Sequence, residues 1–265
     1  MDKIEAALAD VRSWMIQNKL KINDQKTEFL IIAQQHLAKH FKDTTINIGN
    51  SIINQTKQAK NLGVILDQSL SMDSHVSDVC RKCFYHLRNI SAIRKFLSPD
   101  AISQLVHSLV TSRLDYCNAA LVGVTDANIK KLQRVQNVAA RILTCTPRDN
   151  HITPVLFKLH WLPIEARILF KILLFTYKAY HNLAPSYIND LVQHYDPAVS
   201  LRSAAEHLLE LPRSRLKTHG DRAFSIAGPT EWNKLPASLR TLPSLSSFKS
   251  ALKTHLFKVY YPDYC

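Results

Sequence analysis

Apolar residues recur at helical spacing from about Met72 onward, and this pattern restricts the fold more than any other feature. Spacings of three and four residues put such side chains on one helix face, which must pack against another apolar surface. Three successive stripes therefore predict a helical bundle over residues 71–146. Their members are Val76, Val79, Cys83, Leu87, Ile90 and Ile93, then Ile102, Leu105, Leu109 and Val110, then Ile129, Leu132, Val135, Val138, Ala139 and Ile142.

The helix starts have recognisable capping residues. Ser71 or Asp73 is expected to cap the first helix, and Thr125 the third. Ser98-Pro99 is expected to begin the second, because proline is tolerated in the first turn of a helix.

The first 70 residues have a mixed pattern. Residues 2–19 predict an amphipathic helix whose apolar stripe includes Leu8 and Trp14. Residues 27–32 and 61–66 predict strands, and residues 44–48 and 51–53 predict a hairpin around Gly49-Asn50, since glycine supplies the positive φ of a tight turn. The predicted fold class is α+β, mostly α-helical, with a small antiparallel sheet.

The remainder, from residue 147 to 265, predicts a further helical domain beyond a linker at 147–150. Helices are expected over residues 163–183, 186–194 and 244–258, with short extended pieces over 200–242, where prolines and glycines recur. Trp161, Phe224, Trp232 and Phe248 are expected to be apolar anchors. The predicted domains are thus 1–70, 71–146 and 147–265.

The chain is strongly basic, with a formal net charge of +13. Residues 1–72 carry nine basic and seven acidic side chains, and residues 73–265 carry twenty-five and fourteen. This excess favours a polyanionic partner that contacts mainly the second part. No apolar window approaches about 18 residues, so no membrane span is expected. Five irregularly spaced cysteines favour reduced thiols in an intracellular protein, whether nuclear or cytoplasmic.

One segment, Trp14 to Glu28, resembles the motif D region of non-LTR (LINE-type) and group-II-type reverse transcriptases. In that family a helix leads into a turn of the form Asn-x-Leu-x-Leu-Asn-x-x-Lys-Thr and then into a strand of the palm. The residues that match are Asn18, Leu20, Asn23, Lys26 and Thr27, with Ile22 as a conservative variant.

A second segment, Lys60 to Asp67, is similar to the family's next motif, a primer-grip hairpin ending in Leu-Gly-x-x-Leu-Asp before the thumb. Gly63 would permit close approach of a nucleic-acid strand. Later segments also resemble the thumb and the region beyond it, so the likeness covers nearly the whole chain. These segments are Ser112–Asn118, Leu132–Asn137, His160–Ile164 with Arg167, Arg222–Phe224, Trp232–Pro236 and Phe248-Lys249.

The resemblance implies a carboxy-terminal part of an RNA-directed DNA polymerase, comprising the end of the palm, the thumb and a carboxy-terminal region. Its expected partner is an RNA/DNA template–primer duplex. Lys26 would act near the phosphates of the incoming nucleotide. The thumb would hold the sugar-phosphate backbone without reading sequence. The candidate nucleic-acid contacts are Lys21, Asn23, Lys26, Lys60, Gly63, Arg81, Lys82, Arg88, Arg94, Lys95, Lys130, Lys131 and Arg134; for each, a solvated position is the alternative.

The catalytic aspartates of such polymerases are missing from the sequence. They hold two divalent metals against the attacking hydroxyl and the triphosphate. No Asp-Asp or Asp-x-Asp occurs here, and Asp115-Tyr116 has a helical setting. In the family these aspartates precede the helix with which this sequence opens. We therefore expect no cofactor in this chain, with Mg²⁺ required only by a full-length polymerase.

Other chemistry is less favoured. Cys80-x-x-Cys83 with His75 and His86 suggests zinc, but one continuous helix cannot wrap four ligands around a metal. His36 and His40 have metalloprotease spacing, yet Leu37 occupies the position of the glutamate base. A stacking platform of Tyr177, Tyr180 and Tyr187 with Lys171 and Lys178 competes with a simpler core stripe.

Two other classes of function stay open at this stage. In the first alternative, the chain is a noncatalytic module, derived from such an element, that binds nucleic acid or protein. In the second, it is the product of a gene-model fragment without a selected function. Salt-dependent binding to an RNA–DNA hybrid would support duplex holding, whereas no binding at low salt would favour a relic or a protein-interaction role.

Overall fold

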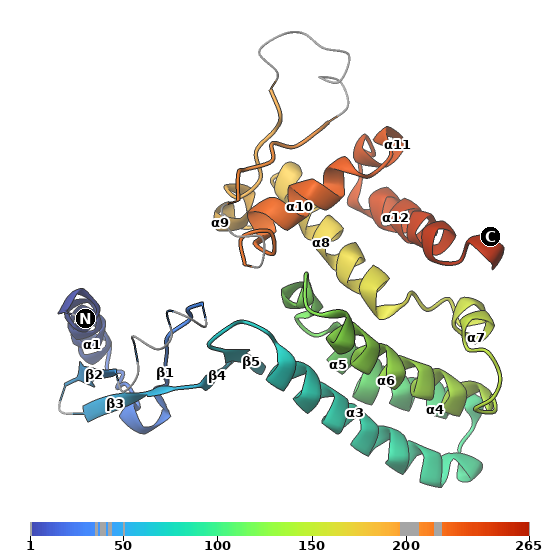
Figure 1. Cartoon of the computed structure of the whole chain (residues 1–265), viewed down its shortest axis with the longest axis horizontal. Coiled ribbons are helices and arrows are strands. Elements are labelled where there is room, and N and C mark those ends of the chain that lie inside the picture. Colours follow the sequence, from blue (N-terminus) through green and yellow to red (C-terminus); the bar gives the residue numbers. More distant parts are fainter. Residues whose placement is uncertain are drawn as a thin grey trace. The chain divides into compact units, whose positions relative to one another are not determined.

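The computed structural model describes residues 2–34, 37, 41, 44–49, 51–196, 207–214 and 219–264 (Figure 1). It divides into two compact units, Met1–His75 and Val76–Cys265. The first holds the strands and the second is helical, so the α+β, mostly helical class is confirmed. The predicted boundary near residue 146 does not separate compact units, because residues 147–265 belong to the same unit as the bundle before them.

The first unit combines one long helix with two small sheets. Its elements are α1 (Asp2–Gln17), the 3₁₀ turn η1 (Asp24–Lys26), β1 (Phe29–Leu30), β2 (Thr45–Ile48), β3 (Ser51–Thr56), β4 (Gln58–Asn61) and β5 (Val64–Asp67). Helix α1 packs on β2, where the Arg12 guanidinium donates to the Ile48 carbonyl and the Asn47 amide donates to Glu5.

The three-stranded sheet has the order β1-β3-β2. Strands β2 and β3 pair antiparallel, with Ile48 opposite Ser51, so the hairpin expected around Gly49 is confirmed. Strand β1 pairs parallel to β3. This sheet is therefore mixed, whereas the β2–β3 and β4–β5 pairs are antiparallel, as expected. The strand expected over residues 27–32 shortens to two residues, Phe29 and Leu30.

The second sheet is a two-stranded hairpin, β4-β5. One strand is expected over residues 61–66, and β5 confirms it from Val64 onward. The expected strand is interrupted at Leu62 and Gly63, which form the turn of the hairpin. Both have positive φ, +45° and +88°, as a type I′ turn requires. Gly63 is thus explained by the turn itself.

A buried aspartate joins β5 to the helix that follows, α3 (Asp73–Ile93). The carboxylate of Asp67 accepts hydrogen bonds from the backbone and hydroxyl groups of Ser69 and Ser71 and from the Met72 amide. Burial raises the pKa of Asp67, but the hydrogen bonds from the Ser71 amide, the Ser69 hydroxyl, the Met72 amide and the Ser71 hydroxyl outweigh it and hold the pKa below its ordinary value. The Ser71 hydroxyl accepts from the amide of Asp73, the first residue of α3, which is a contact two residues along the chain and not the usual capping bond to the second or third helical amide.

The second unit is built from helices. Those before the turn at residues 145–152 are α3, α4 (Pro99–Val106), α5 (Ser112–Asp115) and α6 (Asp126–Thr144), with short 3₁₀ or π turns η3 (Arg94–Phe96), η4 (His107–Thr111) and η5 (Asn118–Leu121). Those after it are α7 (Thr153–Lys158), α8 (Ile164–Tyr180), α9 (Ser186–Asn189), α10 (Phe224–Asn233), α11 (Ala237–Arg240), α12 (Leu245–Tyr260) and the 3₁₀ turn η7 (Pro262–Tyr264).

The three predicted bundle helices are confirmed as α3, α4 and α6. Val76, Cys83, Leu87 and Ile90 are buried on α3. Ser98 caps α4 with its hydroxyl, which accepts from the Ala101 amide. Thr125 precedes α6 but makes no side-chain capping bond, contrary to expectation.

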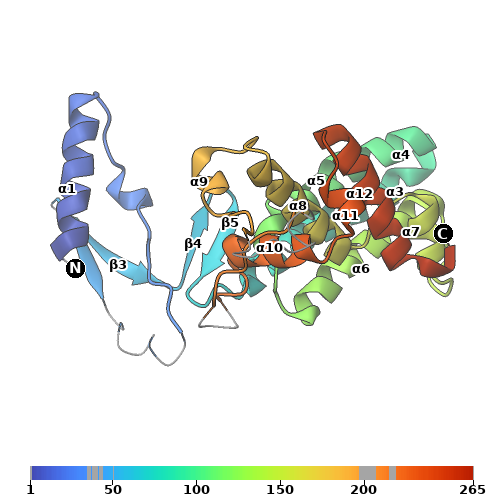
Figure 2. The ribbon, with the colours of Figure 1, turned by 90° about the horizontal axis from the view of Figure 1, so that it is seen from above.

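Helix α8 is the centre of the second unit, and α6, η5, α10 and α12 all pack on it (Figures 1 and 2). Its buried residues lie around most of its circumference, which is the pattern of a helix enclosed by others. Two glutamines of α6 hold the start of α8. Gln136 donates to the Leu162 carbonyl at 2.9 Å, and Gln133 accepts from the Ile164 amide at 2.9 Å.

The expectation of short extended pieces over 200–242 fits residues 207–214, which are not helical, and is wrong for 224–233 and 237–240, where α10 and α11 lie. Gly228 and Pro229 are residues that ordinarily interrupt a helix. Instead Gly228 lies against α8, where an added Cβ would stand 2.7 Å from the Thr176 hydroxyl oxygen. The helix expected over 186–194 ends at Asn189, and His194 pairs with Leu209 in an isolated bridge.

Candidate nucleic-acid interface

The outer face of α3 carries a basic stripe. Arg81, Tyr85 and Arg88 are exposed and stand at positions i, i+4 and i+7, which share one side of a helix. Lys95 follows in η3, and its ammonium lies 4.8 Å from the centre of the exposed Phe96 ring. The stripe thus alternates cations with aromatic rings, opposite the buried face of Val76, Cys83 and Leu87.

Helix α6 carries a second basic stripe, formed by Lys130, Lys131 and Arg134. All three are exposed, whereas Leu132, Val135 and Ala139 of the same helix are buried. The amphipathic spacing that predicted the bundle therefore also determined which cations reach solvent.

The two stripes lie on neighbouring helices. Near the ends of both helices, the Arg94 guanidinium donates to the Ile142 carbonyl at 3.2 Å. Near their beginnings, the Lys131 charge partly offsets the rise in pKa that burial causes at Cys80. Helices α3 and α6 therefore run side by side in the same direction (Figure 1).

Three of the predicted cations are engaged within the protein. Arg81 and Lys82 both bind the Asp78 carboxylate, and the Lys82 hydrogen bond, the Arg81 hydrogen bond and both positive charges hold the pKa of Asp78 below its ordinary range despite burial. Arg94 holds the last turn of α6. Within the described residues no ion pair involves the others, which are Arg88, Lys95, Lys130, Lys131 and Arg134. We call these five the α3–α6 basic surface.

The motif D-like residues lie in the first unit. Asn23 caps η1, its side chain accepting from the Lys26 amide at 3.2 Å, and its carbonyl accepts from the Thr27 hydroxyl at 3.0 Å. Asn23 therefore shapes the turn, as expected of asparagine. Lys21 and Lys26 are exposed.

The hairpin residues are tied to this turn. The Lys60 amide donates to the Glu28 carboxylate at 3.0 Å, so β4 is bonded to the segment that follows Lys26. The Lys60 side chain is exposed, and Gly63 lies in the exposed turn beyond it. The structure thus brings the two motif-like segments of the first unit together.

The aspartate, cysteine and histidine residues considered as catalytic or metal-binding candidates have other roles where the structure describes them. Asp115 binds Arg167 through two hydrogen bonds. Cys80 and Cys83 lie on the continuous helix α3, and burial raises the pKa of Cys83 to about 12, so this thiol stays protonated. His75 accepts from the Ile65 amide. His36 and His40 lie outside the described residues.

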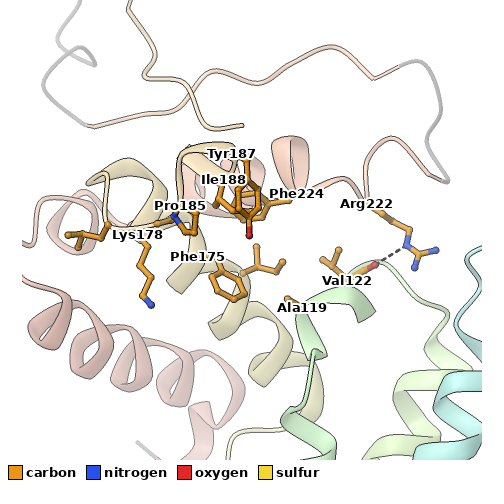
Figure 3. Close-up of a pocket in the computed structure, with 12 residues that line it drawn as sticks. Ala119, Val122, Phe175, Lys178, Pro185, Tyr187, Ile188, Arg222 and Phe224 are labelled. Atoms are coloured by element: carbon orange, nitrogen blue, oxygen red, sulfur yellow. Dashed lines mark hydrogen bonds between the residues drawn. The ribbon is translucent and has the colours of Figure 1, made fainter. Parts of the chain in front are cut away.

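The three tyrosines of the possible stacking platform have different environments. Tyr177 is buried and stacked on Phe248, and Tyr180 packs on Trp232, so for these two the core reading is confirmed. Tyr187 is 69% exposed and lines an apolar pocket of about 470 Å³ between α8 and α9 (Figure 3). Lys178 and Arg222 border this pocket on opposite sides (Figure 3).

Buried polar side chains were missed by sequence reasoning. Gln136 and Arg240 are 2% and 4% exposed, and Arg240 donates to the carbonyls of Asn233 and Leu235. A single sequence shows no signal that distinguishes them from solvated polar residues.

Every helix in the described part of the chain is too short or too polar to cross a membrane. Comparison with protein-family models, with curated proteins and with solved structures yields no match for this chain.

Proposed function

We propose that the chain holds a template–primer duplex by its sugar-phosphate backbone, as the thumb and the end of the palm do in the LINE-type reverse transcriptases that its sequence resembles. The observation that carries this proposal is the α3–α6 basic surface. Its five cations reach solvent, lie on α3, on the turn η3 that follows it and on α6, and have no ion pair among the described residues.

The geometry suits phosphates better than bases. A helix rises about 1.5 Å per residue, so Lys130 and Arg134 lie roughly 6 Å apart along the axis of α6, a separation on the scale of successive backbone phosphates. Two parallel rows of cations then contact backbone at several points. Such contacts fix position on a duplex and carry no sequence information.

The first unit supports the same role. Lys21, Lys26 and Lys60 are exposed, and the Glu28 bond links the turn after α1 to the β4–β5 hairpin. This arrangement is compatible with a strand lying against the hairpin turn at Gly63. The sequence has no Asp-Asp pair, so the proposed role is binding rather than nucleotide transfer.

The test is fluorescence anisotropy with a labelled RNA–DNA hybrid over a range of salt concentrations. A variant with all five cations of the α3–α6 basic surface changed to Gln should bind more weakly. Its plot of log affinity against log salt should be less steep, by about 0.9 for each phosphate that the variant no longer neutralises.

A matched control removes five exposed lysines elsewhere: Lys3, Lys19, Lys57, Lys249 and Lys258. This control variant has the same reduction in net charge, and the slope of its plot of log affinity against log salt should stay close to that of the wild type. An equal effect in both variants would show that only net charge matters and would reject the assigned surface. No binding at low salt would favour a protein-binding role, for which α1 offers its exposed Val11, Trp14 and Ile16.

A further inference from the structure

A pocket of about 250 Å³ lies at one side of α8, and none of its lining residues belongs to the α3–α6 basic surface. Its walls come from four segments that are far apart in the sequence: the end of α5 with the start of η5, the loop before α8, the first half of α8, and α12. Polar side chains that converge from several elements on one cavity are the usual mark of a binding site.

The pocket is cationic. Arg167, Lys171 and Lys253 line it together with His160, whereas Asp115 is the one carboxylate of its wall. Asp115 is already bound by Arg167, whose Nε donates to Oδ1 at 2.8 Å. The two lysines have no ion pair among the described residues, so the pocket keeps an excess of about two positive charges at neutral pH.

The arginine is fixed in place before any ligand arrives. Its side chain is 18% exposed, and its Nε and Nη2 both bond to Asp115. This leaves the Nη1 hydrogens of the planar guanidinium as donors in a fixed direction. Preorganised donors of this kind bind an anion at a small entropic cost.

A buried amide completes the wall. Asn118 is 3% exposed, and its Oδ1 has no hydrogen-bond partner within the described residues. An unpartnered buried acceptor costs about 1–3 kcal/mol unless a ligand or water satisfies it.

We propose that this pocket binds the phosphate monoester of a nucleotide, either free or at the end of a nucleic-acid strand. The phosphate would lie among Arg167, Lys171 and Lys253. Leu162 and Phe170 line the same cavity and provide an apolar wall for the sugar or base. These residues differ from those of the α3–α6 basic surface, so the two proposals stand or fall separately.

The test is isothermal titration calorimetry of the whole chain with adenosine monophosphate and with adenosine. The monophosphate should bind and the nucleoside should not. Changing Lys171 and Lys253 to Gln should weaken binding by about tenfold or more. The matched control changes Lys249 and Lys258, two exposed lysines that do not line the pocket, and should bind like the wild type.

Two oligonucleotides of one sequence, with a 5′-phosphate and with a 5′-hydroxyl, distinguish the sources of the phosphate. A preference for the 5′-phosphate that the pocket variant abolishes assigns the site to strand ends. Equal binding of both oligonucleotides, with the monophosphate still bound, assigns it to free nucleotides. The proposal is overturned if adenosine binds as well as its monophosphate, or if the pocket variant and the control are weakened equally. Unchanged circular dichroism and thermal unfolding would confirm that the variants fold.

Discussion

Asp67 accepts five hydrogen bonds from Ser69, Ser71 and Met72 at the start of α3, and this makes it the best-defined single residue of the first unit. Hydrogen bonds to a charged acceptor are stronger than those between neutral groups. The residue is 9% exposed, so neither water nor salt screens it strongly. Its ionisation state should therefore influence the stability of the β5–α3 junction.

We predict that Asp67→Asn destabilises the first unit by about 1–3 kcal/mol at pH 7, because the amide keeps one acceptor oxygen and places an NH₂ group against backbone donors. The folded pKa is lowered, so the stabilisation is complete above the unfolded value. It is lost as pH falls through the folded pKa, below 3.8. The measurement is amide hydrogen exchange at Ser71 and Met72, with urea unfolding at several pH values.

The matched control is Asp10→Asn, which removes a carboxylate from an exposed position on α1 and should change little. The difference between wild type and Asp67→Asn should shrink at the acidic end of the range. A difference that stays constant with pH would show that the carboxylate charge is not what stabilises the junction.

At the level of elements, the contact between α8 and α10 depends on the absence of a side chain at Gly228. We predict that Gly228→Ala destabilises the second unit by about 1–3 kcal/mol, because the new Cβ would stand 2.7 Å from the Thr176 hydroxyl oxygen in a buried contact. The buried Trp232 of the same helix reports unfolding in urea by its fluorescence.

A double-mutant cycle identifies the cause. Thr176→Ala removes the oxygen that the new methyl group would meet, so the double variant should be more stable than the sum of the single effects predicts. Strict additivity would indicate that Gly228 matters for backbone conformation rather than for close packing.

The elements that local sequence patterns determine were predicted correctly, and those that depend on tertiary contacts were not. Helices α3, α4 and α6 follow from apolar periodicity, which is a local pattern that the sequence displays directly. Helix α10 was missed because Gly228 and Pro229 are ordinarily helix breakers, and only the proximity of Thr176 explains the glycine. The turn at Gly63 was interpreted as strand because the partner strand β4, Gln58 to Asn61, is polar.

The candidate site was predictable to a similar degree. Arg88 and Arg134 were named as candidate contacts from the resemblance to a thumb, and the structure shows both of them exposed. Arg94 was also expected to contact nucleic acid, but the packing of α3 beside α6 gives it the Ile142 carbonyl instead. The pocket around Asn118 was not predicted, since its residues meet only in three dimensions.

At the level of the whole molecule, basic charge and the lack of an aspartate pair together predict binding without polymerisation. In a primer-extension assay with magnesium and deoxynucleotides, the purified 265-residue chain should give only background incorporation, because two-metal catalysis needs carboxylates that the sequence does not supply. A full reverse transcriptase on the same template is the positive control. Clear incorporation that persists after repurification would contradict the prediction.

The burial of Tyr261 has a consequence for how the chain is made. Its hydroxyl donates to the Trp161 carbonyl at 2.6 Å, and α12 before it packs on α8. Contacts one hundred residues apart form only after the later partner has left the ribosome. The first unit can fold while synthesis continues, whereas α8 must wait for α12 with its apolar surface unburied. A chain halted between residues 180 and 245 would therefore leave the side of α8 that faces α12 unburied, and such a surface favours aggregation and chaperone binding.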